Sequence, residues 1–330
     1  MKLARRILAY ALTLIAALLL IIPAGGIARQ TRNAPEQNAR PAAAEPREFT
    51  LTVTDKQGNS VRGLPREAFT VFDGKEQREI VSFSDADAPA TIGVLLDASG
   101  SMGGDGKGGL ARIRNGLLRF FGGCHKADEF FLVAFNQSPQ LLLDMSNDPA
   151  AVLSAIDRFA AGKPKGPTAL YDALYLALNR AAGGKHSTRA LVVVTDGQDN
   201  MSRYSFRETM QVLKESDVIV YTVTLLNSHH DSALDSNGRA VLKELAQHSG
   251  GAALHALNAK ELNDVMSQIA DELRSRYAIA FVPAPGTRKD GWHDVKLKLS
   301  DELRDAQGKK VRHVLRARPG FYDAPAVPRF

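Results

Sequence analysis

Polar side chains follow an apolar segment of the chain in a pattern suited to binding a hard metal ion. The segment Thr91–Asp97 ends in Asp97, and Ser99 and Ser101 take alternate positions in the loop that comes next. Alternate side chains of a tight loop can converge on one point. One carboxylate and two hydroxyls are hard oxygen ligands, which suit Mg²⁺ or Mn²⁺ better than zinc or copper.

Two more segments supply oxygen atoms of the same kind. Asp196 follows the apolar run Ala190–Thr195, and Thr168 lies in a loop that opens a helix. Ligands of open parallel sheets bind at the carboxyl ends of the strands. We therefore expect Asp97 and Asp196 to lie at the same edge of a sheet, with Thr168 between them.

The elements that must position these residues alternate between strands and helices over residues 89–275. Apolar faces of helical spacing occur within residues 110–117, 170–178, 206–213 and 262–273. The near-continuous apolar strands between them predict an α/β, doubly wound, mostly parallel sheet with helices on both sides. The expected strands are Thr91–Asp97, Phe130–Phe135, Ala190–Thr195, Val218–Leu226 and Ala252–Leu257, with Gln140–Leu143 forming an edge hairpin with the second.

The flanking segments alternate between apolar and polar residues, as half-buried strands do. One is an N-terminal β segment, residues 48–84, and the other is a C-terminal β segment, residues 276–323. Neither is large enough to hold a core alone. We expect them to pack together as one discontinuous β-sandwich that the α/β domain interrupts.

Residues 1–28 have the features of an export segment. Lys2, Arg5 and Arg6 precede the apolar stretch of residues 7–22, and Gly26 and Ala28 give the small-x-small pattern of a cleavage site. A cleaved signal peptide and an uncleaved N-terminal anchor both fit. Residues 29–47, rich in Ala, Pro and Arg, predict a flexible linker. The protein is then exported and is either periplasmic, secreted or tethered to the inner membrane by residues 7–22.

Composition excludes several classes of protein. The 330 residues are 44% hydrophobic and 24% charged, which is ordinary for a globular chain and excludes a disordered, collagenous or multi-spanning protein. The net charge is +6. Without the three basic residues of the export segment, 39 basic residues stand against 36 acidic ones, so the net charge is +3. A charge so close to balance gives no argument that the protein binds nucleic acid. A single cysteine excludes an intramolecular disulfide and zinc sites built on cysteines.

The motif residues together resemble the von Willebrand factor type A (VWFA) domain. They are D-x-S-x-S at 97–101, Thr168 at the start of a helix, and T-D-G at 195–197. The resemblance covers roughly residues 89–275 and implies a Rossmann-like fold. In that family these loops form a metal-ion-dependent adhesion site (MIDAS). The flanks resemble a bacterial, acidobacterial-type subfamily of VWFA-related proteins at Val53–Gly58, Leu64–Gly74 and Arg318–Tyr322.

The resemblance implies a role for each of these residues. Asp97, Ser99 and Ser101 would bind Mg²⁺ or Mn²⁺ directly, and Thr168 and Asp196 would bind it directly or through water. The remaining coordination position would take an Asp or Glu carboxylate of a partner protein. Related domains switch affinity by moving their last helix. Here that helix, residues 261–274, runs directly into the strand at Tyr277. We therefore expect that binding of metal and partner could alter the conformation of the sandwich.

Other functions remain open at this point. In a structural envelope protein the metal would only stabilise the fold. An enzyme is less well supported, because nothing in the sequence supplies a base next to a nucleophile. The pattern Gly104-x-Gly106-x-x-Gly109 matches a dinucleotide fingerprint, but it begins too far past the strand.

Overall fold

The computed structural model describes residues 45–100, 109–162, 166–226, 233–284, 291–303 and 312–322. The predicted export segment, residues 1–28, and residues 29–44 of the predicted linker lie outside this part of the chain. Within the described ranges, none of the helices combines the length and the apolar character needed to cross a membrane.

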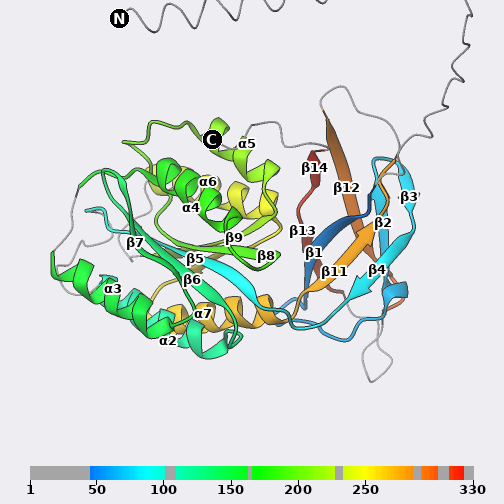
Figure 1. The fold of residues 1–330 in the computed structure, drawn as a ribbon, viewed down its shortest axis with the longest axis horizontal. Coiled ribbons are helices and arrows are strands. Elements are labelled where there is room, and N and C mark those ends of the chain that lie inside the picture. The colour runs from blue at the N-terminus through cyan, green and yellow to red at the C-terminus, as the bar shows by residue number, and fades with distance from the viewer. Residues whose placement is uncertain are drawn as a thin grey trace, which may run out of the picture. The chain divides into compact units, whose positions relative to one another are not determined.

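A six-stranded sheet with the order β10-β9-β8-β5-β6-β7 forms the centre of the larger domain (Figure 1). All neighbouring strands are parallel except β7, which runs antiparallel to β6 at one edge. The predicted edge hairpin is therefore confirmed. Every residue of the central strand β5 is buried, which explains why its sequence is a continuous apolar run. The strands are β5 (Ala90–Asp97), β6 (Glu129–Phe135), β7 (Pro139–Ser146), β8 (Thr188–Val194), β9 (Val218–Leu225) and β10 (Ala253–Ala256).

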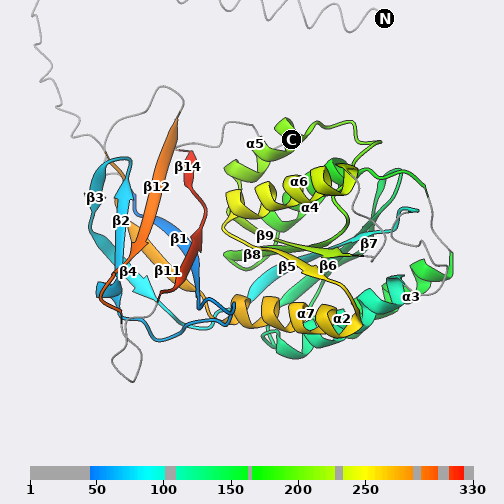
Figure 2. The ribbon, with the colours of Figure 1, turned by 180° about the vertical axis from the view of Figure 1, so that it is seen from behind.

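Helices cover both faces of this sheet and bury two separate apolar clusters against it (Figure 2). One face carries α2 (Gly109–Gly123), α3 (Pro149–Ala161) and α7 (Ala259–Arg274). The other carries α4 (Leu170–Ala182), α5 (Phe206–Glu215) and α6 (Ala233–Ser249). The predicted helical segments all lie in helices, whereas α3 and α6 were not predicted. The doubly wound α/β fold class is confirmed.

Two four-stranded antiparallel sheets lie beside this domain, with the orders β13-β1-β11-β4 and β14-β12-β2-β3. Strands from both ends of the chain pair in each sheet: β1 with β11 and β13, and β2 with β12. The sheets share one apolar core, in which Phe49, Phe281 and Phe321 are mutually packed. The strands are β1 (Arg47–Thr54), β2 (Phe69–Asp73), β3 (Glu76–Arg78), β4 (Ile80–Ser84), β11 (Tyr277–Phe281), β12 (Trp292–Leu299), β13 (Val314–Ala317) and β14 (Gly320–Tyr322), with a short helix η1 (Arg66–Ala68) before β2.

The alternation of β12 turns His293, and not Trp292, into the sandwich core. Trp292 is half-buried and packs edge-on against Tyr322. His293 is buried, its ring stacks on Phe321 at 4.6 Å between centroids, and its Nδ1 lies 2.9 Å from a carboxylate oxygen of Asp73. A buried carboxylate and imidazole thus join β2 to β12 through a polar contact as well as through the strand ladder.

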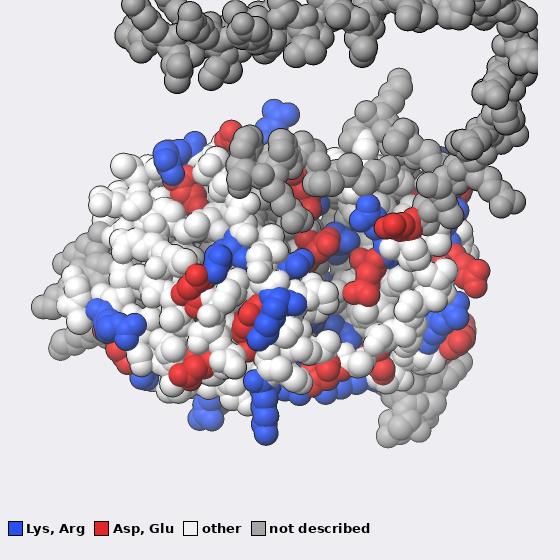
Figure 3. Space-filling view, viewed as in Figure 1, with Lys and Arg blue, Asp and Glu red and all other residues white. Residues whose placement is uncertain are grey.

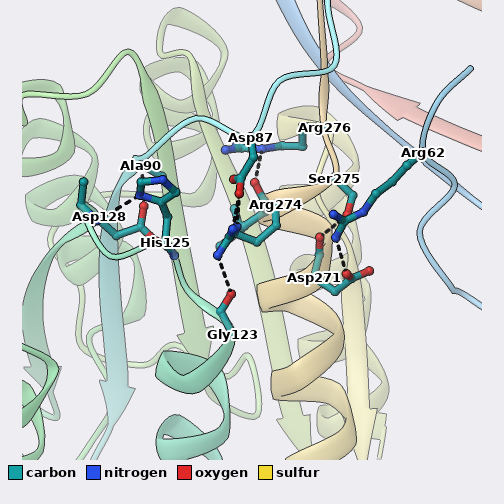
Figure 4. A network of polar contacts seen from close by, with 12 residues as sticks. Arg62, Asp87, Ala90, Gly123, His125, Asp128, Asp271, Arg274, Ser275 and Arg276 are labelled. Carbon is teal, nitrogen blue, oxygen red and sulfur yellow. Dashed lines mark hydrogen bonds and ion pairs between the residues drawn. The ribbon is translucent and has the colours of Figure 1, made fainter. Parts of the chain in front are cut away.

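The last helix of the α/β domain continues almost directly into the sandwich. Only Ser275 and Arg276 separate α7 from β11. A buried carboxylate on α7, that of Glu272, pairs with Arg316 of β13 and accepts a hydrogen bond of 3.1 Å from Gln268. Two exposed ion pairs accompany it: Arg62 with Asp271, and Arg274 with Asp87 (Figure 4). Helix α7 is therefore fixed to the sandwich from several sides.

Charges of both signs are interspersed over the face of the molecule shown in Figure 3. The described part of the chain also holds exposed ion pairs, such as Arg114 of α2 with Asp157 of α3. Pairs of this kind contribute little to stability, because solvent screens them. The buried pair of Glu272 is different in this respect.

Replacing Glu272 with Ala should destabilise the protein by on the order of 3 kcal/mol, because it leaves Arg316 without its carboxylate in a largely buried place. The matched control is Asp271→Ala at the adjacent position of α7, which removes an exposed pair and should cost less than about 1 kcal/mol. Urea unfolding of both variants measures the difference. Equal losses in the two variants would contradict the role given to the buried pair.

Candidate metal centre

Asp97 and Asp196 lie at the carboxyl ends of adjacent strands. Asp97 is the last residue of β5, and Asp196 follows the end of β8 by two positions. The two strands are parallel and paired, with Leu96 opposite Val194. The Asp97 side chain is completely buried, whereas Asp196 is partly exposed. The central strand of the sheet thus ends in a carboxylate that solvent does not reach.

Hydrogen bonds from Ser99 and Thr195 fix the Asp97 carboxylate. Its Oδ1 accepts from the backbone N–H of Ser99 at 2.8 Å, and its Oδ2 accepts from the Thr195 hydroxyl at 2.6 Å. Burial raises the pKa of Asp97 to about 6, and the nearby charge of Asp196 adds to that rise. The hydrogen bonds from Ser99 and Thr195 lower this pKa but do not offset the loss of water completely. A cation at this point would stabilise both carboxylates.

Backbone hydrogen bonds hold the three loops together at this edge. The N–H of Gly100 donates to the carbonyl of Gly166 at 3.2 Å, which joins the first loop to the second. Thr168 donates its N–H to the side-chain oxygen of Asn200 at 2.8 Å and accepts from the N–H of Asn200 at 3.0 Å, which joins the second loop to the third. Thr168 itself is buried.

The third loop depends on a glycine after Asp196. Gly197 has a φ of +84°, and a Cβ at this position would lie 2.4 Å from the carbonyl oxygen of Gly238 in α6. Only glycine can take this conformation at such close range to a backbone atom. The tight turn lets Gln198 donate its N–H to Oδ1 of Asp196 at 3.0 Å. The T-D-G sequence is therefore required by packing as well as by chemistry.

The structure brings Asp97, Ser99, Thr168 and Asp196 to one edge of the sheet. Ser101, the remaining residue of the predicted set, lies outside the described residues. The sequence assigned no role to Asn200, and Asp199 was expected to be a solvated loop charge. Asp199 accepts a hydrogen bond from the Tyr171 N–H at 3.1 Å and one from Ser202, so it fixes the start of α4. The short polar run after T-D-G was the available signal for such a role.

The oxygen atoms present here fit a hard divalent cation. Nowhere in the described ranges do three or more His, Cys, Asp or Glu residues group so that they could hold a metal. Hydroxyl oxygens must therefore complete any site at this edge, as Ser99 and Thr168 can. The hydroxyl of Thr168 and the Oδ2 of Asp196 have no hydrogen-bond partner within the described part of the chain, so their lone pairs are available. Carboxylate and hydroxyl ligands match Mg²⁺ or Mn²⁺.

A family model for the von Willebrand factor type A (VWA) domain matches residues 91–272. The chain belongs to this family. The match begins at the second residue of β5 and ends near the end of α7, so it coincides with the α/β domain. A comparison with curated proteins found no match.

Many solved structures match part of this chain at low sequence identity. A von Willebrand factor type A protein from Catenulispora acidiphila is 12% identical, with a TM-score of 0.48, and the match covers 78% of this chain and 71% of that one. An aerotolerance-related membrane protein from Bacteroides fragilis NCTC 9343 is 19% identical, with a TM-score of 0.45 over 56% of this chain and 98% of that one. Proximal thread matrix protein 1 from the mussel byssus was solved with a zinc-occupied MIDAS motif. It is 17% identical, with a TM-score of 0.48, and the match covers 60% of this chain and 48% of that one.

The raised pKa of Asp97 makes the metal-free VWA domain less stable above that pKa. The penalty is relieved as the pH falls from about 6 towards the ordinary value of 3.8, because the folded protein then takes up the proton before the unfolded chain does. Each pKa unit between these values corresponds to 1.36 kcal/mol, so the full penalty is about 3 kcal/mol.

In chelator, Asp97→Asn should therefore be more stable than the wild type by up to about 3 kcal/mol at about pH 8, and this advantage should shrink at about pH 4.5. Urea unfolding at the two pH values measures the difference. The control is Asp157→Asn, whose carboxylate is exposed and should change stability little at either pH. A less stable Asp97→Asn at the higher pH would contradict the account of this carboxylate.

Proposed function

We propose that the protein is a metal-dependent adhesion or protein-binding protein. A divalent cation, Mg²⁺ or Mn²⁺, would be held by Asp97, Ser99, Ser101, Thr168 and Asp196. An Asp or Glu carboxylate of a partner protein would complete its coordination. The observation that carries this proposal is the fully buried carboxylate of Asp97 at a point where three loops are hydrogen-bonded together.

The ligand set explains why the partner would be acidic. Three of the five proposed ligands are neutral hydroxyls, so two carboxylates at most face a doubly charged ion. A cation in such a site keeps enough positive field to attract another carboxylate. Membership of the VWA family also supports the proposal that the protein binds a partner protein.

We further propose that the protein acts outside the cytoplasm. Residues 1–28 have the pattern of an export signal or an N-terminal anchor, and residues 29–47 that of a tether. The proposal of an acidobacterial-type subfamily rests on Val53–Gly58, Leu64–Gly74 and Arg318–Tyr322. These stretches include parts of strands β1, β2 and β14, so the resemblance in the flanks falls on the sandwich.

A structural envelope protein is the second candidate. Complete burial of Asp97 favours it, since a metal there would stabilise the fold even without a partner. Both candidates require metal binding, and they differ only in whether the bound metal accepts an external carboxylate.

Thermal unfolding of the full chain should show a rise in stability when Mg²⁺ or Mn²⁺ replaces chelator. Metal at 100 times its dissociation constant should add about 2.7 kcal/mol to the folded state. Asp97→Asn should lose this gain, and Asp157→Asn should keep it. A gain of the same size in all three proteins would contradict the proposed ligand.

A fluorescent peptide with a single Glu separates the two candidates. Its anisotropy should rise with wild-type protein in Mg²⁺ and should not rise in chelator or with Asp97→Asn. The control peptide carries Gln in place of Glu and should not bind. If the metal stabilises the fold but neither peptide binds in a metal-dependent way, the structural candidate replaces adhesion.

A further inference from the structure

A polar cavity lies at the opposite edge of the central sheet from the candidate metal centre. Its volume is about 340 Å³, and both the VWA domain and the sandwich contribute to its walls. Two of its lining residues, Thr188 and Asp217, stand at the amino ends of β8 and β9. Asp97 and Asp196 lie at the carboxyl ends of parallel strands of the same sheet. The two sites therefore do not overlap.

One wall of this cavity is a buried arginine. Arg276, in the connection from α7 to β11, is 8% exposed, and its Nε donates to the carbonyl of Leu273 at 3.1 Å. Its Nη1 is buried and has no hydrogen-bond partner in the described part of the chain. Burial lowers the pKa of this guanidinium. A charged group kept in this state without a carboxylate partner costs folding free energy.

Asp87 and Asp128, the two carboxylates whose charges act on Arg276, are already engaged with other groups. Asp87 pairs with Arg274, as Figure 4 shows beside Arg276. Asp128 accepts the N–H groups of Ala90 and His125, at 2.7 and 2.8 Å. Neither carboxylate forms an ion pair with Arg276 in the structure, so their charges act on it only from a distance.

A second arginine lines the cavity without a carboxylate. Arg189, at the second position of β8, forms no ion pair with a described residue, and its buried Nε has no partner there. The remaining lining arginine, Arg318, differs because it pairs with Asp217 and stacks over the ring of Phe49 at 4.4 Å. Three arginines thus line the cavity against two acids, Asp217 and the exposed Glu48, which leaves an excess of one positive charge.

Hydroxyl groups complete the lining. Thr50 from β1 and Thr188 from β8 both border the cavity, and neither hydroxyl is hydrogen-bonded to a described residue. Guanidinium groups bind carboxylate and phosphate oxygens with charge-assisted hydrogen bonds, and hydroxyls can donate to the same atoms. The volume is in the range of pockets that hold small organic molecules.

We propose that this cavity binds a small organic oxyanion, whose charge is balanced by Arg276 and Arg189 and whose other oxygens contact the hydroxyls of Thr50 and Thr188. The ligand would touch strands of both the VWA domain and the sandwich. Its binding would therefore strengthen the attachment between them. This site is independent of the metal centre and does not rest on the proposed adhesion function.

The test is thermal unfolding of the full chain in sodium phosphate, in sodium citrate and in sodium chloride of matched ionic strength, all with chelator present. Citrate probes carboxylate ligands and phosphate probes phosphate ligands. At least one of the two should raise the melting temperature of the wild type by several degrees over chloride. The larger effect identifies the class of oxyanion.

Two variants separate a bound anion from a general salt effect, since phosphate and citrate also favour compact states by exclusion from the surface. Arg276→Met should abolish the anion-dependent rise and, in chloride, should be at least as stable as the wild type, because a buried unpaired charge is removed. Arg119→Met is the matched control at an exposed arginine outside the cavity and should keep the rise.

The outcomes are decisive in either direction. An equal rise in the wild type and Arg276→Met, or no rise in the wild type with either anion, would overturn the proposal. If Arg276→Met does not fold, Arg189→Met replaces it, since that residue is half-exposed at a strand end, and the rise should then fall to less than half.

Discussion

The burial of the Asp97 carboxylate is the constraint on which the rest of the structure depends. The central strand β5 is covered on both faces, so its last residue ends inside the protein and not in solvent. Hydrogen bonds from Ser99 and Thr195 reach the carboxylate oxygens, but they do not offset the loss of water on burial. A buried carboxylate in this state either has a raised pKa or is stabilised by a bound cation. The second and third loops are tied together beside this carboxylate through Thr168 and Asn200, so a cation bound there would have a defined place at the sheet edge.

A second constraint comes from the way in which the VWA domain interrupts the sandwich. Its first strand follows β4 and its last helix leads directly into β11, so both connections pass through the same junction. There, Gly250 lies against the backbone of Ala317 and Arg318, and Glu272 pairs with Arg316 in a buried place. A shift of α7 along its axis would have to break this pair or move β13 with it. Helix α7 and strand β13 are therefore mechanically linked through this pair.

The sequence was most informative where one physical effect acts alone. Continuous apolar runs predicted the buried strands, and Asp97 and Asp196 could be placed at one edge because parallel strands share their carboxyl ends. Helix α3 was missed although Asp148 and Pro149 form a recognisable start, and α6 was missed because Gly238 interrupts its pattern. His293 was not expected in the core, since burial there depends on Asp73 from another strand. Arg276 and Arg189 line the same cavity because segments distant in the sequence pack together. The periodicity of the sequence does not reveal such contacts.

Direct counting of bound Mn²⁺ on the full chain tests the central claim most closely. Free Mn²⁺ gives a strong electron paramagnetic resonance signal that weakens when the ion is bound, so a titration gives the number of sites and their affinity. Our account predicts one site in the wild type whose Mn²⁺ is displaced by excess Mg²⁺ and which is lost in Asp97→Asn. Binding that is unchanged in Asp97→Asn, or no binding to the wild type, would contradict it.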